Sequence, residues 1–214
     1  MPPQPPKSAV HKPLKRPSQA RARFTVQTIY DGMVRIWLRD GPDAVTTKAV
    51  AAETGFAVGT LYDYFPNRTA LFSGYVRHCI DDLLRRLDED ALAARDLPWP
   101  ERLSRMVRMT CGADGAAPCF DHAMLMIEHA IAEDKHHRRV YEELSGAWVR
   151  IIQTWPDLPP GVDARRIRAL FVTVLGTRRY VLLVEPTGPE IGDWVAGLEA
   201  IACRMFDGGS SKAG

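Results

Sequence analysis

The stretch that decides the fold is Val45–Phe65, which reads VTTKAVAAETGFAVGTLYDYF. Gly55 lies four residues after Ala51 and six before Leu61, which is the spacing of a helix-turn-helix. In that motif the small Ala51 lets the second helix approach, Gly55 takes the positive φ of the tight turn, and Leu61 is buried between the helices. The stretch therefore predicts two short helices joined by a turn. Thr46 or Thr47 would cap the first of them, because a hydroxyl there can accept from an otherwise unpaired backbone N–H.

Helical periodicity continues on both sides of this stretch. Apolar residues three and four apart predict a first helix over 18–39 and a long helix over 68–94. The same spacing predicts further helices near 99–111, from about 120 to 131, from Val140 to Trp155, over 163–184 and over 190–206. No strand-like alternation of useful length competes with this pattern. We therefore expect an all-α fold of about nine helices.

The composition is that of an ordinary soluble protein. The chain has 214 residues, 46% of them apolar and 25% charged, which is enough apolar surface for a sizeable core. The longest uncharged apolar stretch in its C-terminal half, residues 169–177, is too short to span a bilayer as a helix. No signal peptide is legible, and the four cysteines lie far apart, as in proteins of a reducing compartment. We therefore expect a cytoplasmic protein.

The formal net charge of +2 hides an asymmetry along the chain. Residues 1–30 carry six lysines and arginines and no acidic residue, and six of the 16 prolines fall within residues 2–17. We expect residues 1–17 to form a disordered basic arm and residues 210–214 a flexible tail. A basic end on a mildly acidic body indicates that this end meets a polyanion, although an arm that only aids solubility would have the same composition.

Residues 23–72 resemble the DNA-binding domain of the tetracycline-repressor (TetR) family of bacterial regulators. The family pattern runs Thr-x-x-Ile-Ala, Ala-Gly-Val-Ser and Gly-Thr-Leu-Tyr-x-Tyr-Phe, followed by a Lys and a Leu. This chain has TKAVA at 47–51, TGFA at 54–57 and GTLYDYF at 59–65, followed by Arg68 and Leu71. The departures are Asp31-Gly32 where Ala-Ala is usual, Phe56 for Val, Ala57 for Ser and Arg68 for Lys. Ala57 removes the hydroxyl that would cap the second helix of the motif.

The resemblance implies a three-helix DNA-binding domain over 18–66 and a helical ligand-binding and dimerisation domain over 67–209. It implies a ligand-responsive transcriptional repressor, a homodimer that binds a palindromic double-stranded DNA operator and is released by a small, largely apolar molecule. A helix-turn-helix protein that binds DNA without a ligand is the alternative, and the sequence does not separate a repressor from an activator. The effector and the operator are not legible in the sequence.

The residues expected to contact DNA lie on and around the second helix of the motif, a recognition helix over 57–65. Val58, Gly59 and Thr60 lie at its N-terminal end, which would face base edges in the major groove. Asp63 can accept from a cytosine amino group or remain a solvated helix residue. By the resemblance and by their chemistry, the phosphate contacts would come from Thr47, Lys48, Tyr62, Tyr64 and Arg68. Either tyrosine can instead pack in the core of the small domain.

The last two predicted helices are the expected dimer surface. Trp194, Leu198, Ile201 and Met205 are spaced 4, 3 and 4 apart and form an apolar stripe on the last helix. Two such helices from each subunit would make a four-helix interface with two-fold symmetry. A final helix with this pattern can also pack on its own body.

The remaining residues give weaker signals. No catalytic or nucleotide-binding motif is legible, so we do not expect an enzyme or a cofactor. His122 and His129 lie seven residues apart, whereas metal sites usually show tighter spacings, so metal sensing is a distant third hypothesis. Methionine and aromatic side chains suit an adaptable effector pocket, although each can equally belong to a filled core. The candidate pocket residues are Met106, Phe120, Met124, Trp148 and Phe171.

Overall fold

The computed structural model describes residues 20–115 and 118–207 of the chain. Within these ranges the chain forms nine α-helices and one short 3-10 helix and has no strand, which confirms the all-α class. The chain divides into two compact units. The first runs to His78 and includes Met126–Ile131, and the second comprises Cys79–Leu125 and the chain from Ala132 on. The predicted arm (1–17) and tail (210–214) lie outside the described residues.

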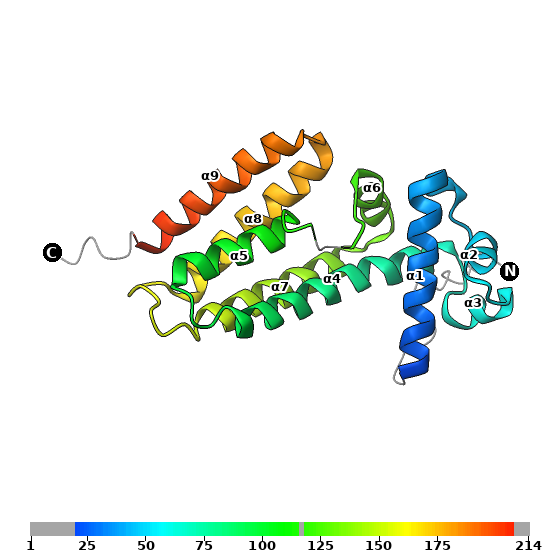
Figure 1. Ribbon diagram of the computed structural model, residues 1–214, viewed down its shortest axis with the longest axis horizontal. Helices are drawn as coiled ribbons and strands as arrows, with labels where there is room; N and C mark the ends of the chain where they lie inside the picture. The colour runs from blue at the N-terminus through cyan, green and yellow to red at the C-terminus, as the bar shows by residue number, and fades with distance from the viewer. Residues whose placement is uncertain (1–19, 116–117, 208–214) are drawn as a thin grey trace, which may run out of the picture. The chain divides into compact units, whose positions relative to one another are not determined.

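The observed helix boundaries follow the hydrophobic periodicity closely (Figure 1). The helices are α1 (Ala20–Asp40), η1 (Pro42–Ala44), α2 (Thr47–Thr54), α3 (Val58–Tyr64), α4 (Arg68–Ala93), α5 (Trp99–Cys111), α6 (His122–Ile131), α7 (Asp134–Ile152), α8 (Ala164–Val184) and α9 (Gly188–Asp207). One prediction differs from the structure. The helix expected from Val140 to Trp155 begins earlier, at Asp134, and ends at Ile152, so Trp155 lies in the following loop.

In the first unit, local interactions define the short helices α2 and α3. The Thr46 side chain caps α2 by accepting from the Ala49 N–H at 3.0 Å. Gly55 ends α2 in the left-handed conformation, with a φ of 72° that favours glycine. Val50 and Leu61 are fully buried. The predicted turn glycine and buried leucine are thus confirmed, and of the two candidate caps Thr46 holds the position.

The helices α1 and α2 approach each other closely at Gly32. A Cβ atom at this position would lie 2.4 Å from Cγ2 of Thr54, which real side chains do not tolerate. The absence of a side chain at Gly32 on α1 therefore leaves room for the Thr54 side chain on α2. Beside this contact, Glu53 forms ion pairs with Arg35 at 2.8 Å and Arg39 at 3.1 Å. Their hydrogen bonds lower the pKa of the Glu53 carboxyl.

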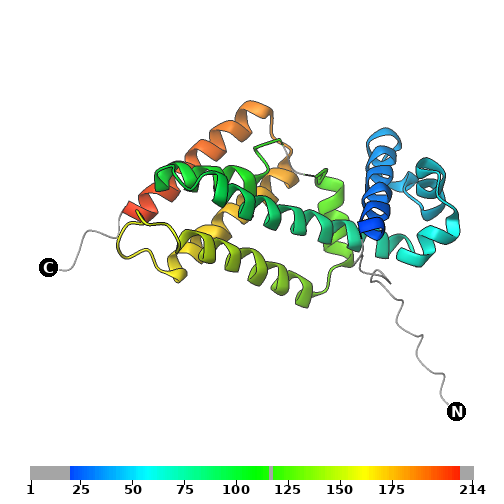
Figure 2. The ribbon, with the colours of Figure 1, turned by 60° about the horizontal axis from the view of Figure 1, so that its bottom comes forward.

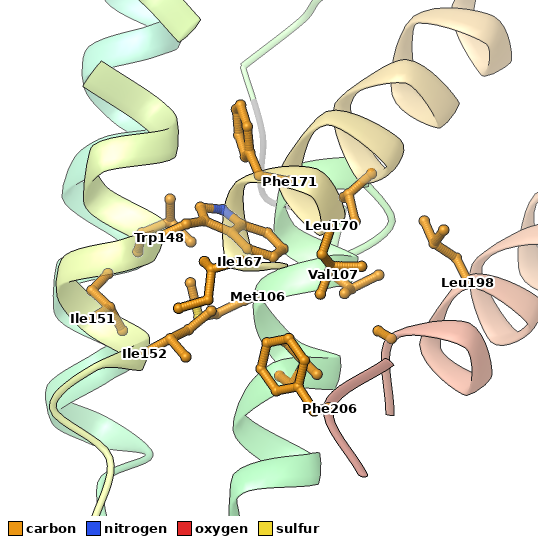
Figure 3. Packing of buried hydrophobic residues seen from close by; sticks show 14 of the residues in the cluster. Met106, Val107, Trp148, Ile151, Ile152, Ile167, Leu170, Phe171, Leu198 and Phe206 are labelled. Carbon is orange, nitrogen blue, oxygen red and sulfur yellow. The ribbon is translucent and has the colours of Figure 1, made fainter. Parts of the chain in front are cut away.

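The second unit is built around one apolar cluster. α5 packs against α8 and α9, and α7 packs against α8, as Figures 1 and 2 show from two sides. The cluster draws side chains from five helices (Figure 3). Its almost completely buried members include Leu87, Met106, Trp148, Phe171 and Phe206. This cluster is the main contribution to the stability of the unit.

Two arginines hold the ends of α5. Near its start the buried Arg102 forms an ion pair with Asp157, and its guanidinium lies 4.8 Å from the ring centroid of Trp155. At its end Arg178 donates to the Cys111 carbonyl at 2.8 Å. A cation is favoured there because the last carbonyls of a helix carry partial negative charge. Burial lowers the pKa of Arg178.

The apolar stripe predicted on the last helix is split between two faces of α9. Leu198 belongs to the apolar cluster of its own unit and is buried, whereas Ile201 is 55% exposed. Trp194 and Met205 are half-buried. The interpretation of Leu198 as an interface residue is therefore wrong, because α9 turns this side of the stripe toward its own unit.

Candidate nucleic-acid interface

The recognition helix α3 turns one face to solvent and the other to the core. Val58, Gly59, Tyr62 and Asp63 are exposed, whereas Leu61 is fully buried. These exposed positions share one side of a helix, because residues four apart lie one above the other. Val58 is 38% and Tyr62 43% exposed. The face predicted to meet DNA is thus accessible in the structure.

The N-terminal end of α3 is open. Its N-cap residue is Ala57, which makes no side-chain cap, and the first turn closes through the Thr60 N–H on the Ala57 carbonyl at 2.9 Å. A Cβ added at Gly59 would meet no atom within 4 Å. Small side chains therefore leave the backbone of this turn accessible to base edges. The prediction that Ala57 provides no hydroxyl cap is confirmed. Thr60 itself is half-buried.

Tyr62 connects the two helices of the motif. The Thr47 hydroxyl donates to the Tyr62 hydroxyl oxygen at 3.4 Å. Thr47 is buried while Tyr62 is exposed, so the tyrosine presents the pair to solvent. Lys48 is exposed beside them on α2, and Tyr64 is half-buried, with its ring centroid 6.5 Å from that of Phe65. Of the predicted phosphate contacts on α2 and α3, Lys48 and Tyr62 are the most accessible.

Arg68 ties the start of α4 to the segment before α2. Its Nε donates to the Val45 carbonyl at 2.8 Å and its Nη2 to the Pro42 carbonyl at 2.7 Å. The guanidinium lies 4.9 Å from the ring centroid of Phe72, and Asp43 is 3.7 Å away. A cation in the first turn opposes the helix dipole, and the two carbonyls offset this. The structure therefore adds a positioning role for Arg68 to the predicted phosphate contact.

Sequence reasoning named Arg68 but missed its contacts, which join parts of the chain that are distant in sequence. Arg68 reaches Val45 and Pro42 across 23 and 26 residues, so no local pattern contains these contacts. The match between Gly32 and Thr54 did leave a signal, because the chain has Thr54 where the family pattern has Ala. Two departures that compensate in volume indicate neighbouring side chains.

The candidate effector residues come together only in part. Met106, Trp148 and Phe171 belong to the apolar cluster of the second unit (Figure 3). Met124 is buried on α6, and Phe120 is half-buried in the segment before it, but neither belongs to that cluster. The structure thus supports a grouping of three of the five predicted residues.

No metal site is formed by the described residues, among which no three His, Cys, Asp or Glu side chains are placed to hold an ion. The cysteines are free. Burial raises the pKa of Cys111 to about 11, so it is a protonated thiol at neutral pH and a poor nucleophile. In the same described ranges, no helix is long and apolar enough to cross a membrane.

Two solved structures with a similar fold are those of regulators. The chain is similar to a TetR transcription regulator from Haloarcula marismortui ATCC 43049, with a TM-score of 0.65, 14% identity, and coverage of 87% of this chain and 98% of that one. It is also similar to the fatty acid degradation regulator FadR from Bacillus halodurans, with a TM-score of 0.58, 17% identity, and coverage of 88% and 96%. At these identities the likeness shows the fold alone. No curated protein matches the sequence.

An all-α chain with an exposed second helix after a glycine turn has the architecture of a helix-turn-helix DNA-binding protein. The family model described as bacterial regulatory proteins, tetR family, matches residues 29–74, which contain α2 and α3. Residues 29–74 therefore form the DNA-binding domain of this family. The resemblance read from the sequence is therefore confirmed.

Proposed function

We propose that the protein is a ligand-responsive repressor that acts in the cytoplasm as a homodimer on a palindromic operator. A small, largely apolar molecule bound in the second unit releases it. The observation that carries the DNA-binding part is the exposed face of α3, held in place by the Thr46 cap, the Gly55 turn and Arg68. Regulators of this family are generally not enzymes, and we propose no catalytic activity.

Selection from random DNA duplexes tests the DNA-binding proposal. The wild type should enrich one palindromic sequence. Tyr62→Phe should weaken binding to all sequences and lower its salt dependence, because a lost phosphate contact carries no sequence information. Thr60→Ala or Val58→Ala should change the preferred sequence instead. Leu92→Ala, an exposed apolar residue of α4 in the second unit, is the control and should change neither. Failure to enrich any site would contradict the proposal.

The dimer proposal rests on an exposed apolar surface on α8 and α9. Its members are Val172, Tyr180, Leu183, Val184 and Ile201, which are 46–60% exposed. Soluble monomers rarely leave such side chains together in water, and membership of the family implies dimerisation. A second copy related by a two-fold axis would cover both helices and form a four-helix interface.

Introducing a charge into this surface tests the interface. Tyr180→Arg or Ile201→Arg should yield monomers by light scattering and lose binding to the palindrome. Leu92→Arg, on an even more exposed apolar residue of α4, should remain dimeric. Leu198→Arg is unsuitable, because Leu198 is buried in its own unit. Dimers that survive both α8 and α9 variants would place the interface elsewhere.

The ligand response follows from the geometry of operator binding. Two half-sites one helical turn apart require recognition helices about 34–36 Å apart in the dimer. An effector that changes this separation by a few Å weakens binding, typically by a coupling of about 1–3 kcal/mol. By linkage, operator DNA must weaken effector binding by the same factor. The alternative, DNA binding without a ligand, predicts that no small molecule alters the operator affinity.

A further inference from the structure

The buried face of α7 carries two polar groups without a hydrogen-bond partner. Ser145 and Trp148 are both 0% exposed, and neither the Oγ of Ser145 nor the Nε1 of Trp148 has a partner. Native proteins leave few buried polar groups unpaired, because each has lost its hydrogen bonds to water. Two such groups on adjacent turns of one helix indicate a site that something else completes.

The face of α7 that carries these two groups packs against Phe171 of α8. The Trp148 and Phe171 rings meet edge to face with centroids 5.7 Å apart, and the Tyr141 ring lies 6.3 Å from Phe171. Ser145 is one turn from each of these two α7 residues, so all three share the face that meets Phe171. Figure 3 shows the indole nitrogen on the ring edge nearer to Phe171. An aromatic face is only a weak acceptor for an N–H group.

A third group of the same kind comes from α5. Thr110 is buried, and its Oγ1 has no partner. The next residue, Cys111, has its Sγ 3.9 Å from the Val174 carbonyl, to which the thiol donates. Val174 lies one turn after Phe171 on α8, so α5 brings this hydroxyl to the same level of the bundle. Three uncharged polar groups from two helices are thus buried without a partner in the second unit.

We propose that Thr110, Ser145 and Trp148, the donor cluster, bind an uncharged oxygen acceptor on the effector, such as the carbonyl of a ketone, ester or amide. The indole N–H can only donate and the hydroxyls can donate, and a carbonyl oxygen with two lone pairs accepts from two of them. The inference rests on the proposed ligand response and names the chemical class of the ligand.

The surroundings of the donor cluster select a neutral and mainly apolar molecule. The neighbouring side chains belong to the apolar cluster, with aromatic rings at Tyr141, Trp148 and Phe171. A carboxylate buried there would lose its hydration, which uncharged donors replace only in part. Arg178, two turns further along α8, already donates to the Cys111 carbonyl. An apolar frame that carries a carbonyl therefore fits this site better than an ion.

Benzophenone and diphenylmethane are matched probes, because they share one frame and differ in the carbonyl oxygen. Binding is followed on the isotope-labelled full chain through the indole N–H signal of Trp148, which Trp148→Phe identifies. We expect benzophenone to shift this signal downfield and to bind about fivefold tighter than diphenylmethane, the worth of one neutral hydrogen bond. Trp148→Phe should abolish this preference. Trp155→Phe, in the same apolar cluster, is the control and should keep it.

A second variant guards against loss of folding. Ser145→Ala removes one donor without changing the bulk of the core and should reduce the benzophenone preference about twofold or more. Equal affinities for the two probes, or benzophenone binding that leaves the Trp148 signal unmoved, would overturn the proposal. Tighter binding of diphenylacetate would overturn it in favour of an anionic ligand at Arg178. Absence of binding by all three probes and by the smaller pair acetophenone and ethylbenzene would also overturn it.

The probe experiment contains no DNA, so it separates this inference from the proposed function. If the chain enriches no operator, the regulator proposal fails whatever the probes show. If the operator is bound but no probe prefers the carbonyl, only the present inference fails. Operator affinity of Ser145→Ala without a probe should stay within about twofold of the wild type, because Ser145 lies outside the helix-turn-helix unit.

Discussion

In the helix-turn-helix unit, Thr46 and Asn67 each accept from the backbone N–H three residues on, at 3.0 and 2.8 Å. In the second unit the hydroxyls of Thr110 and Ser145 are buried and have no partner. The contrast extends beyond these four residues. In the described part of the chain, every buried side-chain nitrogen or oxygen without a hydrogen-bond partner belongs to the second unit. These atoms lie on Arg102, Thr110, Ser145, Trp148 and Arg166.

The difference between the units fits the two kinds of binding that we propose for them. The groove of B-DNA has a fixed shape, so a unit that reads it benefits from one rigid geometry, which satisfied caps and turns provide. A unit that receives a small molecule benefits from groups whose hydrogen bonds are completed only on binding. The polar groups at the helix ends of the first unit are thus satisfied within the chain, whereas several buried polar groups of the second unit are not.

The largest effect should come from breaking the ion pair of Arg102. Asp157→Ala should lower the free energy of unfolding of the second unit by about 3 kcal/mol, because a buried guanidinium loses its carboxylate. Denaturant unfolding measures this. Asp96→Ala, in an exposed pair with Arg95, should change it by less than about 0.5 kcal/mol. Equal losses would show that the Arg102 pair contributes no more than a surface pair.

The same pair gives the second unit a defined acid sensitivity. Desolvation raises the pKa of Asp157, but the hydrogen bond from the Trp99 N–H and the Arg102 guanidinium outweigh it, so that the pKa lies below its usual value. A depressed pKa contributes stability above the unfolded-state value of about 3.9 and loses it as the pH falls through the folded-state value. The free energy of unfolding should therefore decrease as the pH is lowered below about 4. Asp157→Asn should make this decrease with pH less steep.

The next effect should come from filling Gly32. Gly32→Ala should destabilise the helix-turn-helix unit by about 1–3 kcal/mol, because its Cβ would overlap the Thr54 side chain. Combining it with Thr54→Ala should restore most of the loss. Gly59→Ala, at a position with open space, is the control and should not destabilise. Additive losses in the double variant, measured by hydrogen exchange of this unit, would contradict the proposed match.

The smallest effects test the comparison of the two units directly. Thr46→Ala and Asn67→Ala should each cost about 1 kcal/mol, the usual worth of an N-cap. Ser145→Ala should be neutral or slightly stabilising, because it removes a buried hydroxyl that has no partner. Amide hydrogen exchange reads each unit separately. A cost for Ser145→Ala as large as that for Thr46→Ala would show that the Ser145 hydroxyl is satisfied in the folded protein.

The helix-turn-helix was predictable because its determinants are local. The Thr46 cap, the Gly55 turn and the buried Leu61 act within a few residues of the chain, so their spacing carries the information. Helix boundaries elsewhere followed from periodicity for the same reason. The positioning role of Arg68 was not predictable, because its carbonyl partners lie more than 20 residues earlier.

In the interior of the second unit, hydrophobic periodicity does not predict which side chains contact each other. Leu198 and Ile201 lie on one sequence stripe, but the packing of α9 on its neighbours buries the first and exposes the second. Phe120 and Met124 have the right composition for a pocket but lie outside the cluster of Trp148 and Phe171. Helix packing decides which apolar residues contact each other, and the apolar spacing along one helix does not contain this information. Ser145 did leave a trace, as a polar residue at a core position of the α7 pattern.

The contact between Gly32 and Thr54 also has a consequence for the history of the sequence. Alanine is usual in the family at both positions. From Gly32 and Thr54, the Ala-Ala pair can be reached by changing either residue first. If Thr54 changes first, the step leaves only a small void, into which an alanine at position 32 then fits. If Gly32 changes first, the intermediate carries the clash. Selection for a stable fold therefore allows one order of substitution and blocks the other, so this helix contact constrains how the chain can drift.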